Sequence, residues 1–308
     1  MSRPPLVPPI KCQGIKTKLV EDIQQLAQGR ASARWVEPFC GSCVVPLNLQ
    51  PPKALLCDSN LHIINLYRDI QQHKLDAVIV RDFLVAQGAT LLARGEEYFY
   101  EVRERFNSTP TSLDFLFLNR SCFNGVMRFN KKGRFNVPFC RKPERFAPAY
   151  ITKISNQVTS IAKVISNSDW EFRVADFKET LRAASHGDLV YVDPPYAGRH
   201  VDYFNRWTDR DESNLSEMLV VLPCGFILST WHSNEFRTNL TVKKNWSADR
   251  FHVFTKSHFY HVGSSEDLRH PMIEALVTNF PAEHLPLVAK SSQQSLLLRE
   301  EAKAYVAV

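Results

Sequence analysis

Residues 188–196 read Asp188-Leu189-Val190-Tyr191-Val192-Asp193-Pro194-Pro195-Tyr196. The run from Leu189 to Val192 is short and apolar, which is typical of a parallel strand buried on both faces. A carboxylate and two prolines close the run, and proline cannot donate a backbone N–H to a sheet. The stretch therefore predicts a central strand that ends at a cleft, with Asp193 and Tyr196 beside it.

Other strands with polar ends flank this stretch in the sequence. Strand-like runs are Trp35-Val36 leading into Glu37-Pro38-Phe39-Cys40-Gly41-Ser42, 53–57 ending at Asp58, 172–174 ahead of Asp176, 226–230 and 273–278. Amphipathic helices are predicted over 18–28, 151–165 and 213–222. Strands that alternate with helices predict an open α/β sheet whose ligands bind at the carboxyl ends of the strands.

Two of these strand ends have the composition of a nucleotide site. A glycine directly after a strand, such as Gly41, lets the backbone approach a ligand, although a plain tight turn has the same composition. Asp58 lies near the offset of about 20 residues at which dinucleotide-binding folds place an acid for the ribose hydroxyls. The alternative for Asp58 is a helix N-cap for the segment that starts near Asn60.

The Asp193–Tyr196 motif has the composition of a pocket for a planar group with an amino nitrogen. The carboxylate and the carbonyl oxygen of Pro194 can accept the amino hydrogens, and the ring of Tyr196 can stack on the planar face. The alternative is a Pro-Pro loop with an incidental Asp and Tyr. We assign the catalytic role to Asp193, Pro194, Pro195 and Tyr196.

The sequence changes character between residues 69 and 148. Charged helical segments are followed by a polar, aromatic stretch from Leu118 to Pro138, with Lys132-Gly133 as a predicted hairpin tip. Positive side chains bind phosphates and planar ones stack on bases; the alternative is a solvated basic loop whose Phe side chains fill a small core. The side chains concerned are Arg120, Arg128, Lys131, Lys132, Arg134, Arg141, Lys142, Arg145, Phe123, Phe129, Phe135 and Phe139.

Composition sets broad limits on the partners. The chain has 308 residues and a net charge of +6, which is compatible with a nucleic-acid partner but does not establish one. Residues 1–10 are Pro-rich and lack the apolar core of a signal peptide, and no run approaches about 18 apolar residues, so we expect a cytoplasmic protein without membrane contact. The seven cysteines, including Cys40 and Cys43, lack zinc-site spacing, so we expect reduced thiols and no metal.

Four segments together resemble the Dam-type amino-methyltransferases of bacteria and phages, which place a target-recognition insert before a D-P-P-Y motif. Residues 11–16 resemble their K-W-x-G-G-K segment, and residues 37–43 resemble E-P-F-x-G-x-G. Residues 119–138 resemble the recognition hairpin N-R-x-x-x-N-G-x-x-R-x-N…F-N-V-P, and residues 193–196 are the D-P-P-Y motif. The resemblance runs from about Pro9 to about Phe280.

The resemblance implies a Rossmann-like methyltransferase core at 1–68 and 149–280, a helical and β-hairpin recognition insert at 69–148, and a tail at 281–308. It implies transfer of a methyl group from S-adenosyl-L-methionine to N6 of a flipped adenine. We expect Asp58 to hold the cofactor ribose, Lys16 to lie near its methionine end, and Arg128 to read a base. The full cofactor set is Cys12, Lys16, Glu37, Phe39, Gly41, Asp58, Asp176 and Asp193, and the DNA set is Arg120, Phe123, Asn124, Arg128, Lys131, Lys132 and Arg134. The alternative for Arg120 is a role in supporting the fold.

Three departures from the family pattern bear on the cofactor site. The family often has Trp in place of Cys12, and Gly in place of Ile15 and Cys43. The replacements at Cys12 and Cys43 leave as an alternative a DNA-binding protein that has lost catalysis. A separate alternative is the same fold acting on cytosine N4 or RNA, although relatives that act on cytosine tend to have Ser in place of Asp193. The expected partners are double-stranded DNA and a cognate restriction endonuclease, with the chain acting as a monomer.

Overall fold

The computed structural model describes residues 4–196, 207–234, 238–246, 250–259 and 271–281. The strands of these residues form one sheet in the order β3-β2-β1-β4-β5-β7-β6. β1 to β5 pair in parallel, and β7 runs antiparallel to both β5 and β6. The strands are β1 (Trp35–Glu37), β2 (Lys53–Asp58), β3 (Asp169–Val174), β4 (Leu189–Val192), β5 (Gly225–Asn234), β6 (His252–Phe259) and β7 (Pro271–Thr278). The predicted open α/β sheet is confirmed.

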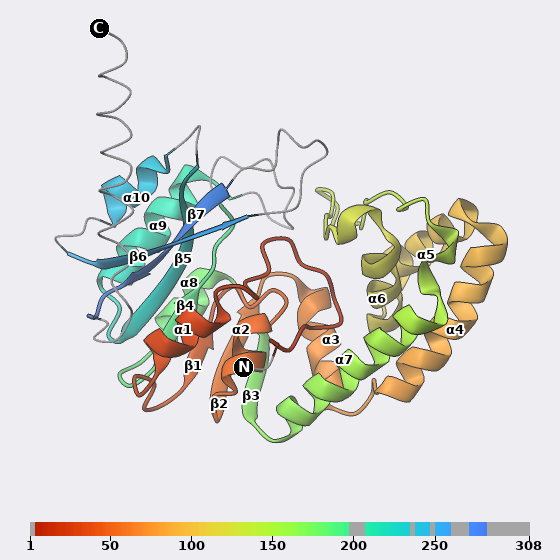
Figure 1. Ribbon diagram of the computed structural model, residues 1–308, viewed down its shortest axis with the longest axis horizontal. Coiled ribbons are helices and arrows are strands. Elements are labelled where there is room, and N and C mark those ends of the chain that lie inside the picture. Colours follow the sequence, from red (N-terminus) through yellow and green to blue (C-terminus); the bar gives the residue numbers. More distant parts are fainter. Residues whose placement is uncertain (1–3, 197–206, 235–237, 247–249, 260–270, 282–308) are drawn as a thin grey trace, which may run out of the picture.

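Helices cover both faces of the sheet (Figure 1). Successive strand residues point to opposite faces, so each strand contributes to two cores. Trp35 and Tyr191 pack on one face, with α1 (Val20–Ala27), α2 (Val44–Leu49), α3 (Leu61–Gln71) and α7 (Pro148–Ser166). Val36 and Val192 pack on the other, with α8 (Phe177–Arg182), α9 (Asp209–Val220) and α10 (Leu240–Asn245).

The carboxyl ends of β1, β2 and β4 meet at one edge of the sheet. β1 pairs with β2 on one side and with β4 on the other, so the direction of winding reverses there. Open α/β sheets bind ligands outside the strand ends at such a switch point. Glu37 ends β1, Asp58 ends β2 and Asp193 directly follows β4, so three of the predicted site residues come together at this edge.

The residues between α3 and α7 form a group of helices beside the sheet. They are α4 (Ala77–Arg94), α5 (Glu96–Ser108), α6 (Ser112–Ser121) and the short 3-10 turns η1 (Phe123–Gly125) and η2 (Pro143–Phe146). Figure 1 shows α4, α5 and α6 together, away from the sheet. Asp76 caps α4, because its carboxylate accepts the N–H groups of Val78 and Ile79 at 2.8 Å each.

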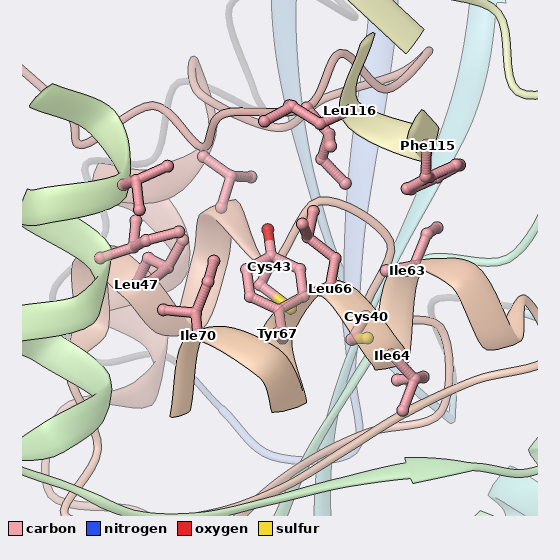
Figure 2. Close-up of a cluster of buried hydrophobic side chains, with 14 of the residues drawn as sticks. Cys40, Cys43, Leu47, Ile63, Ile64, Leu66, Tyr67, Ile70, Phe115 and Leu116 are labelled. Carbon is pink, nitrogen blue, oxygen red and sulfur yellow. The ribbon is translucent and has the colours of Figure 1, made fainter. Parts of the chain in front are cut away.

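These helices share one hydrophobic cluster with the core of the protein. Phe115 and Leu116 of α6 belong to the same cluster as Ile63 and Leu66 of α3, and Figure 2 shows them on facing elements. Apolar side chains therefore anchor the insert to α3. The boundaries of core, insert and tail remain a prediction, because the cluster does not divide at residue 69.

The segment that follows α6 turns back on itself at the predicted position. Phe129 and Phe135 form an antiparallel bridge. The side-chain oxygen of Asn130 accepts the N–H groups of Lys132 at 2.9 Å and Arg134 at 3.1 Å, which closes the turn. The arms pair through isolated bridges and not through regular strands, so this segment (residues 122–139), called the recognition loop below, is an irregular hairpin.

Three further features concern the described residues only. There, no group of three His, Cys, Asp or Glu side chains is arranged to hold a metal ion. None of the helices in this part of the chain has the length and apolar character needed to cross a bilayer. All seven cysteines are free thiols.

Candidate active site

Asp193 lies at the carboxyl end of β4, in contact with a lysine from the N-terminal segment. Its Oδ2 is 3.0 Å from Nζ of Lys16. The same ammonium group donates to the carbonyl oxygen of Gly14 at 2.7 Å and lies over the ring of Tyr196, 5.0 Å from the centroid. Lys16 is 4% exposed and Asp193 is 21% exposed, so the carboxylate is the partner that solvent or a ligand can reach.

The surroundings of Asp193 shift its titration towards neutral pH. Burial raises the pKa of Asp193 to about 6, because the carboxylate loses hydration. The ammonium group of Lys16 and the hydroxyl of Tyr196 lower this pKa, while the negative charge of Glu274 raises it. At pH 7 and above, the group is therefore mainly a carboxylate that can accept hydrogen bonds.

Glu274 is a buried acid beside the motif that the sequence analysis did not identify. It lies on β7 and is 1% exposed. Its Oε1 accepts a hydrogen bond from the hydroxyl of Tyr196 at 3.4 Å. A signal was present in the sequence, since Glu274 is the one charged residue in the run 271–278, and buried charges are rare without a partner.

Glu37 ends β1 deep in the protein. Its side chain is 2% exposed, and its Oε1 accepts the indole N–H of Trp35 at 2.7 Å. Burial raises the pKa of Glu37 well above its usual value, because the charged form loses hydration. This environment suits a structural hydrogen bond beneath the site, and the predicted cofactor contact of Glu37 remains a prediction.

Asp58 and the glycine turn after β1 are joined by hydrogen bonds. Oδ2 of Asp58 accepts the N–H of Gly41 at 2.9 Å, and Oδ1 accepts the N–H of Asn60 at 2.8 Å. The N-cap of α3 is Asn60, whose side chain accepts the N–H of His62 at 3.0 Å. The alternative role of Asp58 as the helix cap is therefore wrong, and its half-buried carboxylate keeps lone pairs for a further donor.

The turn keeps its shape although Cys43 stands where the family has glycine. Gly41 has φ +47° and Cys43 has φ +55°, both in the left-handed region. A residue with a Cβ adopts this region at a cost of about 1–2 kcal/mol. The N–H of Cys43 donates to the carbonyl oxygen of Cys40 at 2.7 Å, and the hydroxyl of Tyr67 donates to the backbone carbonyl oxygen of Ser42 at 2.5 Å. Both hydrogen bonds stabilise the turn.

Cys12, which replaces the family tryptophan, lies against this turn. Its Sγ is 3.6 Å from the point where a side chain at position 41 would begin. Burial raises the pKa of the Cys12 thiol to about 12, and the carboxylates of Asp58 and Asp193 also raise it. The thiol is therefore neutral and lies near both carboxylates of the site.

An aromatic group lies next to the ends of β1 and β3. Phe39 stacks on Phe177 with ring centroids 5.5 Å apart, and the ring of Trp207 meets Phe39 edge-on at 5.6 Å. Asp176, which precedes Phe177, is exposed and caps α8 by accepting the N–H of Lys178 at 2.8 Å. The backbone that leads into this aromatic group lies beside the end of β2, since the N–H of Ala175 donates to the carbonyl oxygen of Asp58 at 3.2 Å.

The prediction that Arg120 binds DNA is contradicted by its burial. Arg120 is 5% exposed, and its guanidinium donates to the carbonyl oxygens of Pro8 and Pro9, to Tyr150 and to Gln157. Its neighbour Asn119 is fully buried and exchanges two hydrogen bonds with the backbone of Lys11, at 2.7 and 2.9 Å. The end of α6 therefore fixes residues 8–11 of the N-terminal segment.

The other predicted DNA residues lie on the recognition loop. Phe123 is 55% exposed, and Asn124 has φ +53°. Arg128 is half-buried and donates to the side-chain oxygen of Asn136 at 2.9 Å and to its carbonyl oxygen at 3.1 Å. Lys131, Lys132 and Arg134 are exposed near the loop tip, where Arg134 also pairs with Glu104.

Three of the interleaved Phe side chains are interior residues. Phe129, Phe135 and Phe139 are between 1% and 7% exposed. Phe129 stacks on the ring of His62 with centroids 5.1 Å apart, and burial lowers the pKa of His62 to about 4. The interpretation that these three rings stack on bases is therefore wrong, and Phe123 is the ring of this set that remains accessible.

Comparison with known proteins assigns the chain to a family. Residues 13–262 match the D12 class N6 adenine-specific DNA methyltransferases. The chain belongs to this family. It is 32% identical over 220 residues to the retron Ec67 DNA adenine methylase of Escherichia coli, covering 68% of this chain and 71% of that protein. It is 33% identical over 195 residues to the DNA adenine methylase of Serratia marcescens, covering 61% and 66%.

A third relative is the type II methyltransferase M1.LlaDCHI of Lactococcus lactis subsp. cremoris. The chain is 27% identical to this relative over 199 residues, which cover 62% of the chain and 66% of the relative. The matched region thus spans about two thirds of the length of the curated relatives. The predicted family and the predicted class of activity, DNA adenine methylation, are confirmed.

The fold of the methyltransferase brings most of the predicted site residues to one edge of the sheet. Lys16 contacts Asp193, Gly41 contacts Asp58, and Cys12 lies near both carboxylates. The roles of these residues towards cofactor and substrate remain predictions.

Proposed function

We propose that this chain transfers the methyl group of S-adenosyl-L-methionine to N6 of one adenine in a short, specific sequence of duplex DNA. The observation that carries the proposal is the environment of Asp193. Its carboxylate follows β4 at the switch point of the sheet, shares the ammonium group of Lys16 with the ring of Tyr196, and lies at the same edge as Asp58 at the end of β2. A hydrogen-bond acceptor next to an aromatic face suits a planar base that carries an amino group.

The residues present fit the proposed cofactor. Asp58 presents a carboxylate fixed by two backbone N–H groups, which suits a pair of ribose hydroxyls. Gly41, with φ +47° and no side chain, forms the turn beside Asp58, and the partly exposed ring of Phe39, stacked on Phe177, is an aromatic group that an adenine ring could pack against. The cofactor would supply an electrophilic methyl group on a sulfonium, and no metal is needed.

The chain's own residues would orient the target base. Asp193 and the carbonyl oxygen of Pro194 accept the two amino hydrogens, and the ring of Tyr196 stacks on the base. This arrangement would keep the nitrogen lone pair free to take the methyl group that the cofactor would supply, and the amino proton would then pass to solvent. Flipping the adenine out of the duplex costs a few kcal/mol, which contacts in the pocket offset.

The recognition loop is the proposed reader of the DNA sequence. Lys131, Lys132 and Arg134 are exposed cations that can neutralise phosphates, and the exposed ring of Phe123 can stack on a base. Arg128 has two N–H donors that can pair with guanine after their hydrogen bonds to Asn136 break.

The likeness to a type II methyltransferase supports a role beside a cognate restriction endonuclease. The likeness to a retron methylase supports a different genetic setting. In both settings the substrate is DNA inside a bacterial cell, and we propose that the chain acts there as a monomer on bacterial or phage DNA.

The test is transfer of labelled methyl from S-adenosyl-L-methionine to unmethylated genomic DNA, followed by digestion to nucleosides and single-molecule sequencing. The proposal expects N6-methyladenine in one sequence context and its loss in Asp193→Ala, with DNA binding retained. Formation of N4-methylcytosine would mean that the substrate is cytosine, and a preference for RNA over duplex DNA would mean that the substrate is RNA. DNA binding without any methyl product would mean that catalysis has been lost.

A further inference from the structure

The geometry points to a second role for Lys16. We propose that, in the resting enzyme, its ammonium group occupies the place that the target amino group must take, and that Lys16 has to leave Asp193 before an adenine can bind productively. Lys16 is thus a positioning residue that controls access to the catalytic carboxylate. This inference rests on the proposed function, because it takes Asp193 and Tyr196 as the groups that hold the base.

The contacts of Lys16 are those that a bound amino group needs. Nζ of Lys16 is 3.0 Å from Oδ2 of Asp193 and lies over the ring of Tyr196, 5.0 Å from the centroid. In the proposed complex, the amino nitrogen of the base donates to the same carboxylate, and the base lies on the same ring. Oδ1 of Asp193 keeps lone pairs, but the ammonium group holds Oδ2 and lies over the ring on which the base would stack, so the lysine competes with the substrate for this position.

Burial makes the ion pair a defined resting state and not a surface contact. Lys16 is 4% exposed, and its third neighbour is the carbonyl oxygen of Gly14 at 2.7 Å. Gly14 has φ +74°, a left-handed conformation that glycine adopts readily. The carbonyl oxygen of Gly14 and the carboxylate of Asp193 together fix the position of the ammonium group.

Departure of Lys16 from Asp193 needs another anion for its charge, because a buried ammonium without a partner is strongly disfavoured. The amino group of adenine is neutral and cannot replace that charge. The nearest chemistry that can is the α-carboxylate at the amino-acid end of the cofactor, since the segment of Lys16 also carries Cys12, which lies against the turn at Gly41. Cofactor binding would therefore free Asp193 and precede productive entry of the base.

The variant that isolates this role is Lys16→Met, which keeps the length of the side chain and removes its charge. Lys16→Arg keeps the charge and is the matched control. The readout is the fluorescence of 2-aminopurine placed at the target adenine of the mapped recognition site, with S-adenosylhomocysteine as the probe for the cofactor. This signal reports flipping and does not require methyl transfer.

The proposal expects flipping in the wild-type protein to depend on S-adenosylhomocysteine, and expects Lys16→Met to flip the base without it. Lys16→Arg should retain the dependence. A Lys16→Met protein that still needs S-adenosylhomocysteine for flipping would overturn the proposal, because Lys16 would then be a cofactor ligand only. Absence of flipping in the wild-type protein with the probe bound would instead refute the proposed function.

A measurement on the unaltered protein guards against a variant that does not fold. Among the residues that the structure describes, the charged and titratable groups around Asp193 are Lys16, Glu37, Tyr191, Tyr196, Cys12 and Glu274. Of these, Lys16 is the cation, so its departure must raise the pKa of Asp193, by roughly 1–3 units. Carboxyl-labelled NMR titration with and without S-adenosylhomocysteine measures this shift, and an unchanged pKa on binding would contradict the exchange.

Discussion

The hydroxyl of Tyr196 donates to Oε1 of Glu274 at 3.4 Å, across 78 residues of sequence. The contact joins the end of the D-P-P-Y motif to β7, the reversed strand of the sheet. The ring is thereby held at its hydroxyl end by Glu274 while Lys16 lies over its face. Tyr196 is 8% exposed, so its orientation depends on these neighbours and not on solvent.

Replacing Glu274 should separate the hydrogen bond from the charge. In Glu274→Gln an amide oxygen can still accept from Tyr196, while the negative charge that raises the pKa of Asp193 is lost. We expect nearly normal kcat and an acid limb of the pH profile that moves below pH 6. Glu274→Leu removes the acceptor, and we expect kcat to fall roughly tenfold, in line with about 1.5 kcal/mol for a hydrogen bond to a charged group. Equal loss in both variants would mean that the contact does not orient the ring.

The acid limb of the reaction should follow the ionisation of Asp193. Burial raises the pKa of this group to about 6, so its charged form is lost on acidification earlier than that of an ordinary Asp. The carboxylate is needed to accept the amino hydrogens. We therefore expect kcat/KM for S-adenosyl-L-methionine, which reports the free enzyme with Lys16 still paired to Asp193, to be level above pH 7 and to fall about tenfold per unit below pH 6. Initial rates between pH 5 and 8 measure this, and a limb centred near pH 4 would exclude Asp193 as the titrating group.

Arg128→Ala should relax the choice of DNA sequence. A guanine contact through two donors is worth roughly 1–3 kcal/mol of discrimination, so we expect discrimination at one base position to fall by about 5–150-fold. Affinity for S-adenosylhomocysteine should not change. Methylation of a library of near-cognate duplexes measures the effect. The matched control is Arg81→Ala, because Arg81 is exposed on α4 and pairs with its neighbour Asp82. Unchanged discrimination in Arg128→Ala would remove the assignment.

Arg120→Ala should lower stability without changing the salt dependence of DNA binding. The substitution leaves the carbonyl oxygens of Pro8 and Pro9 without their buried donor, which costs about 2–4 kcal/mol. Replacement of Lys131 and Lys132 by alanine should do the reverse, with normal stability and a shallower dependence of log K on log salt. The slope should change by roughly 0.9 for each phosphate that the variant no longer neutralises. Denaturation curves and a salt titration distinguish the two results.

The sheet and the strand-end carboxylates could be predicted because both leave local signals. Apolar runs that end in Asp58 or Asp193 define buried parallel strands, and the topology rule places their ends at one edge. β6 was not predicted, because residues 252–259 mix polar and apolar side chains without a regular alternation. The strand lies at the edge of the sheet, where such a mixture is tolerated.

Contacts between distant residues could not be predicted in this way. The pair of Lys16 with Asp193 and that of Tyr196 with Glu274 depend on how separate elements pack, and no spacing encodes them. The same limit explains Arg120, because a basic stretch does not reveal which of its cations the fold buries.

The hold of α6 on the N-terminal segment limits how this protein can be re-engineered. Asn119 and Arg120 belong to the insert, yet they bind the backbone of residues 8–11, a few residues before Lys16. A recognition insert taken from a relative would have to form these contacts with the N-terminal segment as well as read its DNA sequence. Exchange of sequence specificity between such enzymes should therefore succeed when residues 8–16 are transferred together with the insert. The two transferred segments are separate in the sequence but in contact in the fold.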